Sequence, residues 1–140
     1  MITSIIGNTL TDDAKIIRQR VFMEEQGFQN EFDDIDNAAR HIVLYENDRP
    51  AATGRWYVKD GAAVIGRVAV LPEFRHMHLG AAVLRRLEED AAAAGYHTVT
   101  LSAQCRVRGF YEKQGYRAVG EPYLDEFCEH IRMEKTQPVP

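Results

Sequence analysis

The sequence is poor in cysteine and lacks any apolar run long enough to cross a bilayer. Its two cysteines, Cys105 and Cys128, do not form a CxxC pair, which excludes a disulfide framework. A membrane-spanning helix needs about 20 consecutive apolar residues, and no run approaches that length. The N-terminal segment MITSIIGNTLTDD also lacks the basic start and the apolar stretch of a secretory signal. We therefore expect a reduced, cytoplasmic protein that does not enter membranes.

The chain also lacks an excess of basic residues, since its formal net charge is −4. Proteins that bind nucleic acids neutralise phosphates with clustered Lys and Arg, so we expect no nucleic-acid partner. Residues 67–117 contain eight Lys and Arg against five Asp and Glu, whereas the rest of the chain is acidic. This distribution favours two ligands of opposite charge, with a chance imbalance as the alternative.

Hydrophobic periodicity predicts two long helices. The first covers residues 11–26, with Thr11 as its cap. Its buried stripe would consist of Ala14, Ile17, Val21 and Phe22. The second covers residues 79–94 and ends at Gly95. Its apolar face would consist of Val83, Leu84, Leu87, Ala91 and Ala94.

Apolar segments bounded by turn residues predict strands on either side of the second helix. These segments are residues 41–46, 51–59, 62–71, 97–103, 116–120 and 129–135. We expect a short helix over 106–115, a polar loop or short helix over 28–40, and a tail over 136–140. No repeat or linker divides the chain, so residues 1–140 should form one α+β domain with a mixed sheet.

A potential anion site lies where the predicted strand 62–71 leads into the second helix. The connecting turn begins at Pro72, supplies the cation of Arg75 and contains Gly80, which has no Cβ to obstruct a ligand. Free N–H groups of the first helical turn bind anions, and the helix dipole adds positive potential. The P-loop and GxGxxG patterns are both absent. His76 and His78 leave a metal site as an alternative, but no third ligand is apparent, and we expect no metal.

This turn resembles the central motif of the GNAT superfamily of acetyl-CoA-dependent N-acetyltransferases, Q/R-x-x-G-x-G/A. Arg75 takes the first position and Gly80 the last, while His78 stands at the middle glycine. The resemblance implies that main-chain amides from His76 to Ala81 surround the CoA pyrophosphate. It also implies that Val68 and Val70 pair with the pantetheine arm. The implied cofactor-binding residues are Val68, Val70, Arg75, His76, Met77, His78, Leu79, Gly80, Ala81, Gln104, Phe110 and Tyr111.

A second motif strengthens the resemblance. The superfamily often shows N-x-x-A-x-x-F-Y after the next strand, and here that frame holds Gln104, Val107, Phe110 and Tyr111. The segments RQRVFMEEQGF, GRVAV, VGEPYLDE and EHIRM are similar to those of the smaller ElaA-like branch. The implied fold is α+β, a three-layer GNAT-like arrangement in which helices flank a mixed, mostly antiparallel central sheet.

The implied reaction moves the acetyl group of acetyl-CoA to a primary amine by direct attack in a ternary complex. The main-chain N–H of Val70 would stabilise the oxyanion, and the Tyr111 hydroxyl would donate to the leaving sulfur. A buried tyrosine with only a packing role is the alternative for Tyr111. Candidates for the base and for acceptor binding are Glu24, Glu25, His41, Glu126 and His130.

A cluster of acidic residues between positions 24 and 36 bears on the acceptor. They are Glu24, Glu25, Glu31, Asp33, Asp34 and Asp36. They favour a small, cationic amine as acceptor, although an acidic loop that serves only solubility explains them as well. A non-catalytic acyl-CoA-binding regulatory module is the alternative function. Exposed strand edges leave a homodimer open.

Overall fold

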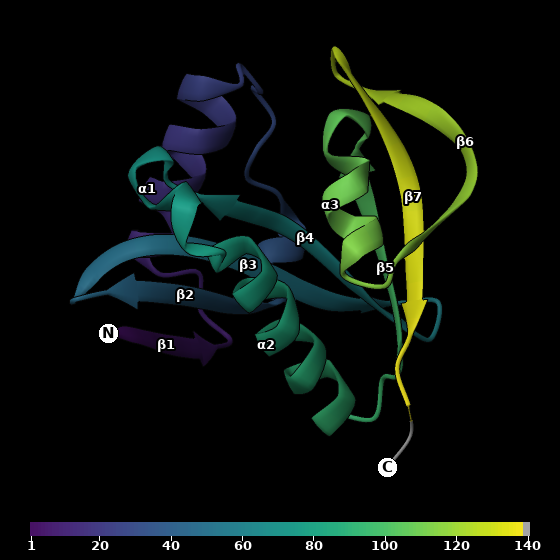
Figure 1. Cartoon of the computed structure of the whole chain (residues 1–140), viewed down its shortest axis with the longest axis horizontal. Coiled ribbons are helices and arrows are strands. Elements are labelled where there is room, and N and C mark those ends of the chain that lie inside the picture. Colours follow the sequence, from purple (N-terminus) through teal and green to yellow (C-terminus); the bar gives the residue numbers. More distant parts are fainter. Residues whose placement is uncertain (139–140) are drawn as a thin grey trace.

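A seven-stranded sheet in the order β1-β2-β3-β4-β5-β7-β6 forms the centre of the computed structural model, which describes residues 1–138 (Figure 1). The strands are β1 (Ile2–Gly7), β2 (Arg40–Glu46), β3 (Arg49–Lys59), β4 (Ala62–Val70), β5 (Thr98–Gln104), β6 (Arg117–Asp125) and β7 (Cys128–Thr136). Only β4 and β5 pair in parallel, and the other neighbours are antiparallel. The predicted mixed, mostly antiparallel sheet is therefore confirmed.

Helices flank this sheet on both faces. They are α1 (Asp12–Arg18), α2 (Leu79–Ala93), α3 (Arg108–Lys113), the π-helix η1 (Gln19–Glu25) and the 3₁₀ turns η2 (Asp34–Asn37), η3 (Pro72–Met77) and η4 (Cys105–Val107). A Cβ built on Gly54 of β3 would meet Val83 and Leu87 of α2 at 2.7 and 2.9 Å. The next residue, Arg55, binds Asp36, which also binds Arg18 of α1. Successive strand residues face opposite sides, so α1 and α2 cover opposite faces, and the three-layer arrangement is confirmed.

The core lies between these layers, where the predicted helical stripes are buried. Ala14, Ile17 and Val21 of the first helix have exposed fractions of at most 3%. Thr11 caps this helix as expected, since its hydroxyl accepts a hydrogen bond from the Ala14 N–H at 3.2 Å. Four of the five predicted residues of the second helix are buried, namely Val83, Leu84, Leu87 and Ala91. Ala94 follows the end of α2 and is exposed.

Several segments differ from the sequence prediction. The edge strand β1 was not predicted, because none of its residues is fully buried and they give no clear apolar alternation. Strand β6 extends to Asp125 instead of ending at residue 120, since it is held by pairing with β7 rather than by burial. The predicted tail starts too early, because Thr136 still pairs with Thr98. Residues 139 and 140 of that tail lie outside the described part.

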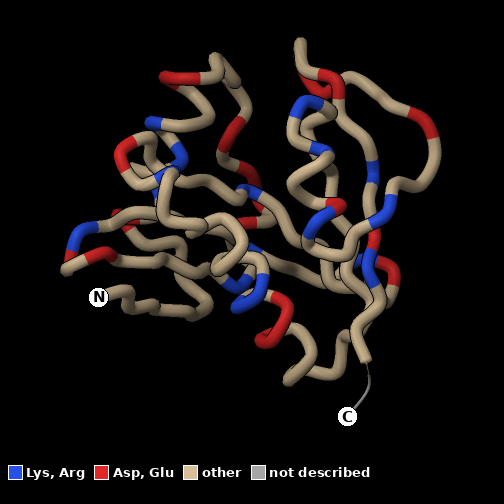
Figure 2. Tube along the Cα trace, in the orientation of Figure 1, with Lys and Arg blue, Asp and Glu red and all other residues tan. Residues whose placement is uncertain are grey.

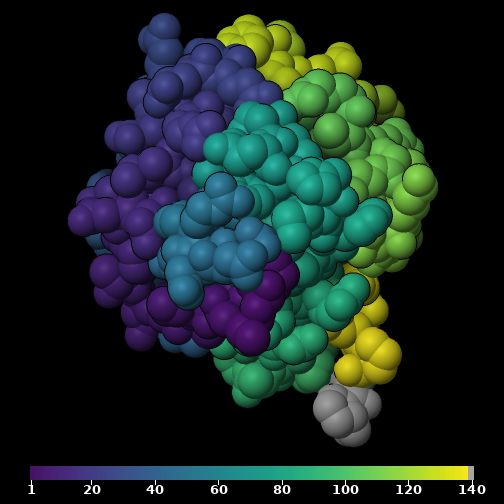
Figure 3. Space-filling view, turned by 60° about the vertical axis from the view of Figure 1, so that its left-hand side comes forward, coloured from purple at the N-terminus to yellow at the C-terminus, as the bar shows by residue number. Residues whose placement is uncertain are grey.

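The sheet separates between β4 and β5. These strands pair only at Ala63–Val99, Val64–Thr100 and Ile65–Leu101. Just beyond, β4 contains a bulge at which Arg67 adopts a left-handed backbone with φ of 54°. The carboxyl-terminal half of β4 therefore leaves β5, and a wedge opens beside it. Figure 3 shows η3 and α2, in teal, at the surface between the N-terminal part and the region of α3.

Within residues 1–138, no helix combines the length and the apolar composition needed to span a bilayer.

Candidate active site

A cavity of about 780 Å³ occupies the wedge between β4 and β5. Its walls come from η1 and the loop that follows it, from β4, from the start of α2, from the end of β5, from α3 and from the β6–β7 turn. Such a volume is within the range of small-molecule and cofactor sites. The cavity thus joins six segments of the chain at the point where the sheet is unpaired.

The main chain of Val70 faces this cavity. The N–H of the next residue, Leu71, donates to Ala51 of β3 at 2.9 Å. Polar groups of successive strand residues point to opposite sides, so the N–H and C=O of Val70 point away from β3 and into the wedge. The C=O accepts a hydrogen bond from Arg75 Nε at 3.1 Å. Val70 therefore presents main-chain groups to any ligand in the cavity.

The start of α2 forms the second wall. His78, just before the helix, has a left-handed backbone with φ of 58°, a conformation that glycine adopts without steric cost. His78, Leu79, Gly80 and Ala81 line the cavity. A Cβ on Gly80 would lie 3.3 Å from the Phe110 ring, so the absence of a side chain keeps this passage open.

Two residues of the predicted anion-binding turn, His76 and Met77, lie outside the cavity wall. The His76 side chain is exposed, Met77 packs against the core, and neither belongs to the cavity wall. Residues 1–138 contain no group of three or more His, Cys, Asp or Glu placed to share a metal ion. In this part of the chain, the cavity wall is instead formed by Arg75 and by residues from His78 to Ala81.

Arg75 is paired with an acidic residue from η1. Its Nη1 and Nη2 donate to the two carboxylate oxygens of Glu25 at 2.7 and 2.6 Å. The hydrogen bond from Arg75 lowers the pKa of Glu25. Both side chains line the cavity, so the charge of Arg75 is partly neutralised where an anionic ligand would approach.

Tyr111 lies on α3 at the inner side of the cavity. Its ring contacts Phe110 and Tyr116 edge-on, with centroid distances of 5.1 and 6.1 Å. The Tyr116 hydroxyl donates to Glu88 at 2.6 Å, which fixes that neighbour. Burial raises the pKa of Tyr111 to about 12. The phenol is therefore protonated at neutral pH and can donate a hydrogen bond.

His130 and Gln104 face each other across the β5–β7 pair and both line the cavity. His130 is buried, and its Nδ1 lies 3.0 Å from the Cys128 carbonyl oxygen. Because a carbonyl only accepts, Nδ1 donates to it, which leaves Nε2 as the ring nitrogen that can face a ligand. Gln104 donates to Gln26 at 2.8 Å, which connects the end of β5 to the segment after η1.

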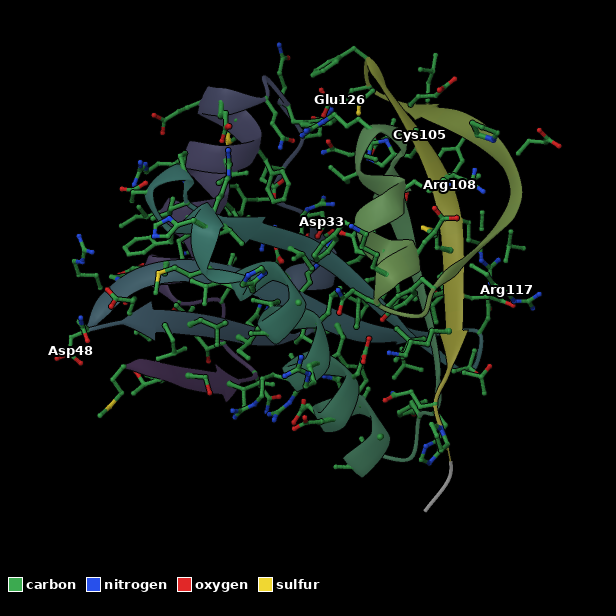
Figure 4. The ribbon with its side chains drawn as sticks, viewed as in Figure 1. Asp33, Asp48, Cys105, Arg108, Arg117 and Glu126 are labelled. Atoms are coloured by element: carbon green, nitrogen blue, oxygen red, sulfur yellow. The ribbon has the colours of Figure 1, made fainter. Side chains whose placement is uncertain are left out.

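The acidic cluster near residue 33 is bound by arginines. Arg18 donates to Glu31 at 2.7 Å and to Asp36 at 2.8 Å, while Arg55 donates to both Asp33 and Asp36 at 2.7 Å. Figure 2 shows these acidic residues on the segment between η1 and β2, and Figure 4 shows Asp33 near the centre of the molecule. Three of the six acidic residues of the predicted cationic-acceptor surface therefore serve an internal ion-pair network.

Two predicted acceptor residues lie outside the cavity. His41 is buried on β2, where its Nε2 contacts the Asp36 main-chain oxygen at 2.9 Å. Glu24 is exposed and is not among the residues that line the cavity. Glu25, Glu126 and His130 do line the cavity. His41 and Glu24 are therefore not placed to contact a ligand in this cavity.

Other lining residues were missed by sequence reasoning. Phe28 and Asn30 from the loop after η1, Arg67 from the β4 bulge and Asp125 from the β6 end all line the cavity. Phe28, Arg67 and Asp125 lie in segments similar to the ElaA-like branch, but that similarity assigned them no role, and the fold brings them to one cavity.

Residues 9–137 match the sequence model of the family described as acetyltransferase (GNAT) domain. The chain belongs to the GNAT family of acetyltransferases. Like its family, it is an acyltransferase. YjcF of Bacillus subtilis, named as an uncharacterized N-acetyltransferase, is 36% identical over 126 residues, which cover 88% of this chain and 90% of YjcF.

Solved structures of GNAT proteins share the fold. Escherichia coli ElaA superposes with a TM-score of 0.82 at 28% identity and covers 96% of this chain and 99% of its own. This supports the predicted ElaA-like branch. A GNAT acetyltransferase from Elizabethkingia anophelis, solved with acetyl-CoA bound, has a TM-score of 0.75 at 16% identity and covers 96% of this chain and 97% of its own.

Proposed function

We propose that this GNAT protein transfers the acetyl group of acetyl-CoA to the primary amine of a small, cationic acceptor. The amine attacks the thioester directly while both substrates are bound. One observation carries this proposal: the main chain of Val70, which is turned away from β3, and the hydroxyl-bearing Tyr111 face the same cavity. The Elizabethkingia anophelis relative, which holds acetyl-CoA on the same fold, supports the choice of cofactor.

The cavity wall fits a phosphate-bearing acyl carrier. The amides from His76 to Ala81 and the guanidinium of Arg75 would hold the pyrophosphate, because α2 starts there without a side-chain cap. Val68 and Val70 would pair with the amides of the pantetheine arm along the open edge of β4. Gln104 and Phe110 would line the rest of its path. When bound, the cofactor supplies the activated acetyl group.

The chain's own groups would then act on the transfer. The Val70 N–H would donate to the carbonyl oxygen as negative charge develops, a type of contact worth roughly 3–4 kcal/mol elsewhere. The Tyr111 O–H would donate to the sulfur as the thiolate leaves, since its pKa of about 12 keeps it protonated. His130 Nε2 would accept the proton of the amine, directly or through water.

The acceptor end of the cavity supports a cationic amine. Asp125 and Glu126 line it beside His130 and Asn30, and Figure 2 shows acidic residues at the β6–β7 turn. Two carboxylates at the mouth attract a protonated amine, and a neutral imidazole further in can remove its proton.

A thiol-release assay tests the proposal. Purified protein would be incubated with acetyl-CoA and a panel of polyamines, aminoglycosides and lysine-like amines, and free CoA would be measured with a thiol reagent. We expect amine-dependent release that Tyr111→Phe reduces. Binding of acetyl-CoA without release for any amine would instead identify a non-catalytic acyl-CoA-binding regulatory module.

A further inference from the structure

A carboxylate connects the β6–β7 turn to the loop that follows η1. The two oxygens of Glu126 accept hydrogen bonds from the Gln29 N–H at 3.2 and 3.3 Å, and one of them also accepts from the Asn30 N–H at 3.2 Å. These segments are 96 and 97 residues apart in sequence. Figure 4 shows Glu126 at the tip of the β6–β7 hairpin. An ionised acceptor makes such hydrogen bonds stronger than neutral ones.

Aromatic rings reinforce the same contact. Phe127 stacks on Phe28 with a centroid distance of 4.9 Å and an interplanar angle of 27°. Phe28 in turn meets His130 edge-on at 6.3 Å. Phe28 is buried whereas Phe127 is 62% exposed. The β6–β7 turn therefore packs on the solvent-facing side of the loop. The position of the loop is thereby linked to the wall that holds His130.

The backbone of Glu126 is unfavourable for a residue with a side chain. Its φ is 55°, in the left-handed region that glycine adopts without cost. A two-residue hairpin turn commonly holds glycine or asparagine at such a position. The chain has a glutamate there, and its carboxylate holds the two main-chain N–H groups of the loop. The strain is thus accompanied by a contact that glycine cannot make.

We propose that Glu126 determines acceptor specificity by fixing the width of the acceptor end of the cavity. Phe28 and Asn30 form one wall of this end, and Asp125, Glu126 and His130 form the other. Glu126 holds the two walls together, so compact amines enter and bulky amines are excluded. This inference rests on the proposed function, because it concerns the acceptor of that reaction.

The test compares Glu126→Gln with Glu129→Gln, which makes the same charge change on an exposed residue of β7 outside the cavity wall. The acceptors are 1,3-diaminopropane and 2,2-dimethyl-1,3-diaminopropane, which differ only in bulk. In the wild type we expect kcat/KM to favour the unbranched diamine by about tenfold or more, a typical effect of added methyl groups. Glu126→Gln should lower this ratio at least about threefold with KM for acetyl-CoA unchanged, and Glu129→Gln should not.

Hydrogen exchange supplies a readout that does not depend on turnover. The amides of Gln29 and Asn30 should exchange about tenfold faster or more in Glu126→Gln, and at the wild-type rate in Glu129→Gln. Glu126→Gly, which relieves the left-handed strain, should show the same loss of selectivity in a stably folded chain. Unchanged exchange, or an unchanged ratio between the diamines, would overturn the proposal.

The two proposals fail in different ways. If wild-type protein releases no CoA with any amine, the proposed reaction is wrong. The preference is then read from the dissociation constants of the two diamines, measured by NMR titration. A preference lost only in the Glu126 variants would still support the specificity role, and equal constants in all variants would refute it.

Discussion

Arg75 and Glu25 form a two-pronged ion pair at the mouth of the cavity, with N–O distances of 2.7 and 2.6 Å. The pair joins η1 to η3 across 50 residues of sequence. Its side chains are 43% and 39% exposed, so solvent screens their attraction. The same two N–H groups of Arg75 are the ones that the proposed pyrophosphate would use.

Replacing Glu25 should therefore strengthen cofactor binding. An exposed pair of this kind contributes roughly 0–1 kcal/mol, so Glu25→Gln should tighten CoA up to about fivefold by removing the competing carboxylate. Isothermal titration calorimetry at low salt measures this effect. Glu24→Gln, on an exposed neighbour outside the cavity wall, is the control and should leave the affinity unchanged. Weaker CoA binding by Glu25→Gln would show that the ion pair helps to position Arg75 for the cofactor instead of competing with the cofactor for Arg75.

Tyr111→Phe removes the proposed donor to the leaving sulfur while keeping the ring contacts with Phe110 and Tyr116. We expect the acetylation rate to fall roughly ten- to a thousandfold, near the scale of a general acid. The dissociation constant for CoA should stay close to that of the wild type. In the wild type, the pKa of about 12 keeps Tyr111 protonated, so its ionisation should not limit the rate below about pH 11. An equal rate in both proteins would leave Tyr111 with only a packing role.

His78→Gly tests the left-handed residue at the start of α2. A residue with a Cβ loses about 1–2 kcal/mol in this conformation, whereas glycine loses about 0.5–1 kcal/mol in chain entropy. The variant should thus be as stable as the wild type or up to about 1 kcal/mol more stable, as measured by urea unfolding. His76→Gly, two residues earlier and outside the left-handed region, should instead be destabilised. Loss of stability in His78→Gly would mean that the imidazole makes a contact that outweighs the strain.

The buried network around Asp36 should govern acid stability. Burial alone would favour the neutral carboxyl, but hydrogen bonds from Arg18 and Arg55 outweigh it and lower the pKa of Asp36 to about 2. The folded chain therefore keeps this carboxylate ionised at pH values where the unfolded chain takes up a proton. Its contribution to stability is complete above about pH 5 and is lost as the pH falls toward 2.

Asp36→Asn should lower the free energy of unfolding at pH 7 by about 3–5 kcal/mol, because it leaves two buried arginines short of a partner. The difference from wild type should shrink by about 1 kcal/mol at pH 3. Urea unfolding at the two pH values measures both. A difference that is equal at pH 7 and pH 3 would contradict the low pKa.

The segments that were predicted well from the sequence are those whose structure is determined by residues close to one another in the chain. The turn before α2 could be recognised because Arg75, His78 and Gly80 lie within six residues, and its glycine does face the cavity. The stripes of the two long helices follow from spacing in the same way. The fold class needed little more, since hairpins and one crossover helix limit the topologies.

The segments that were predicted poorly are those whose structure is determined by contacts with residues distant in the sequence. The acidic residues near Asp36 looked like a surface for a cation, but Arg18 and Arg55 bind them from 18 and 19 residues away. The position of His130 at the cavity follows from its register opposite Gln104, which no local pattern specifies. Strand β1 lies at the sheet edge with no fully buried residue, so its sequence shows no periodic apolar pattern.

Because β4 and β5 pair over so short a stretch, a ligand bound in the cavity beside them would affect the stability of the whole sheet. Three residue pairs are all that connect the four-stranded part of the sheet to the three-stranded part there. A ligand whose amides pair with the free edge of β4 lengthens that connection and bridges both parts. At a hundredfold excess over its Kd, such a ligand adds about 2.7 kcal/mol to the free energy of unfolding. If an acyl carrier binds in the wedge as proposed, it would extend the sheet in the manner of an additional strand as well as react.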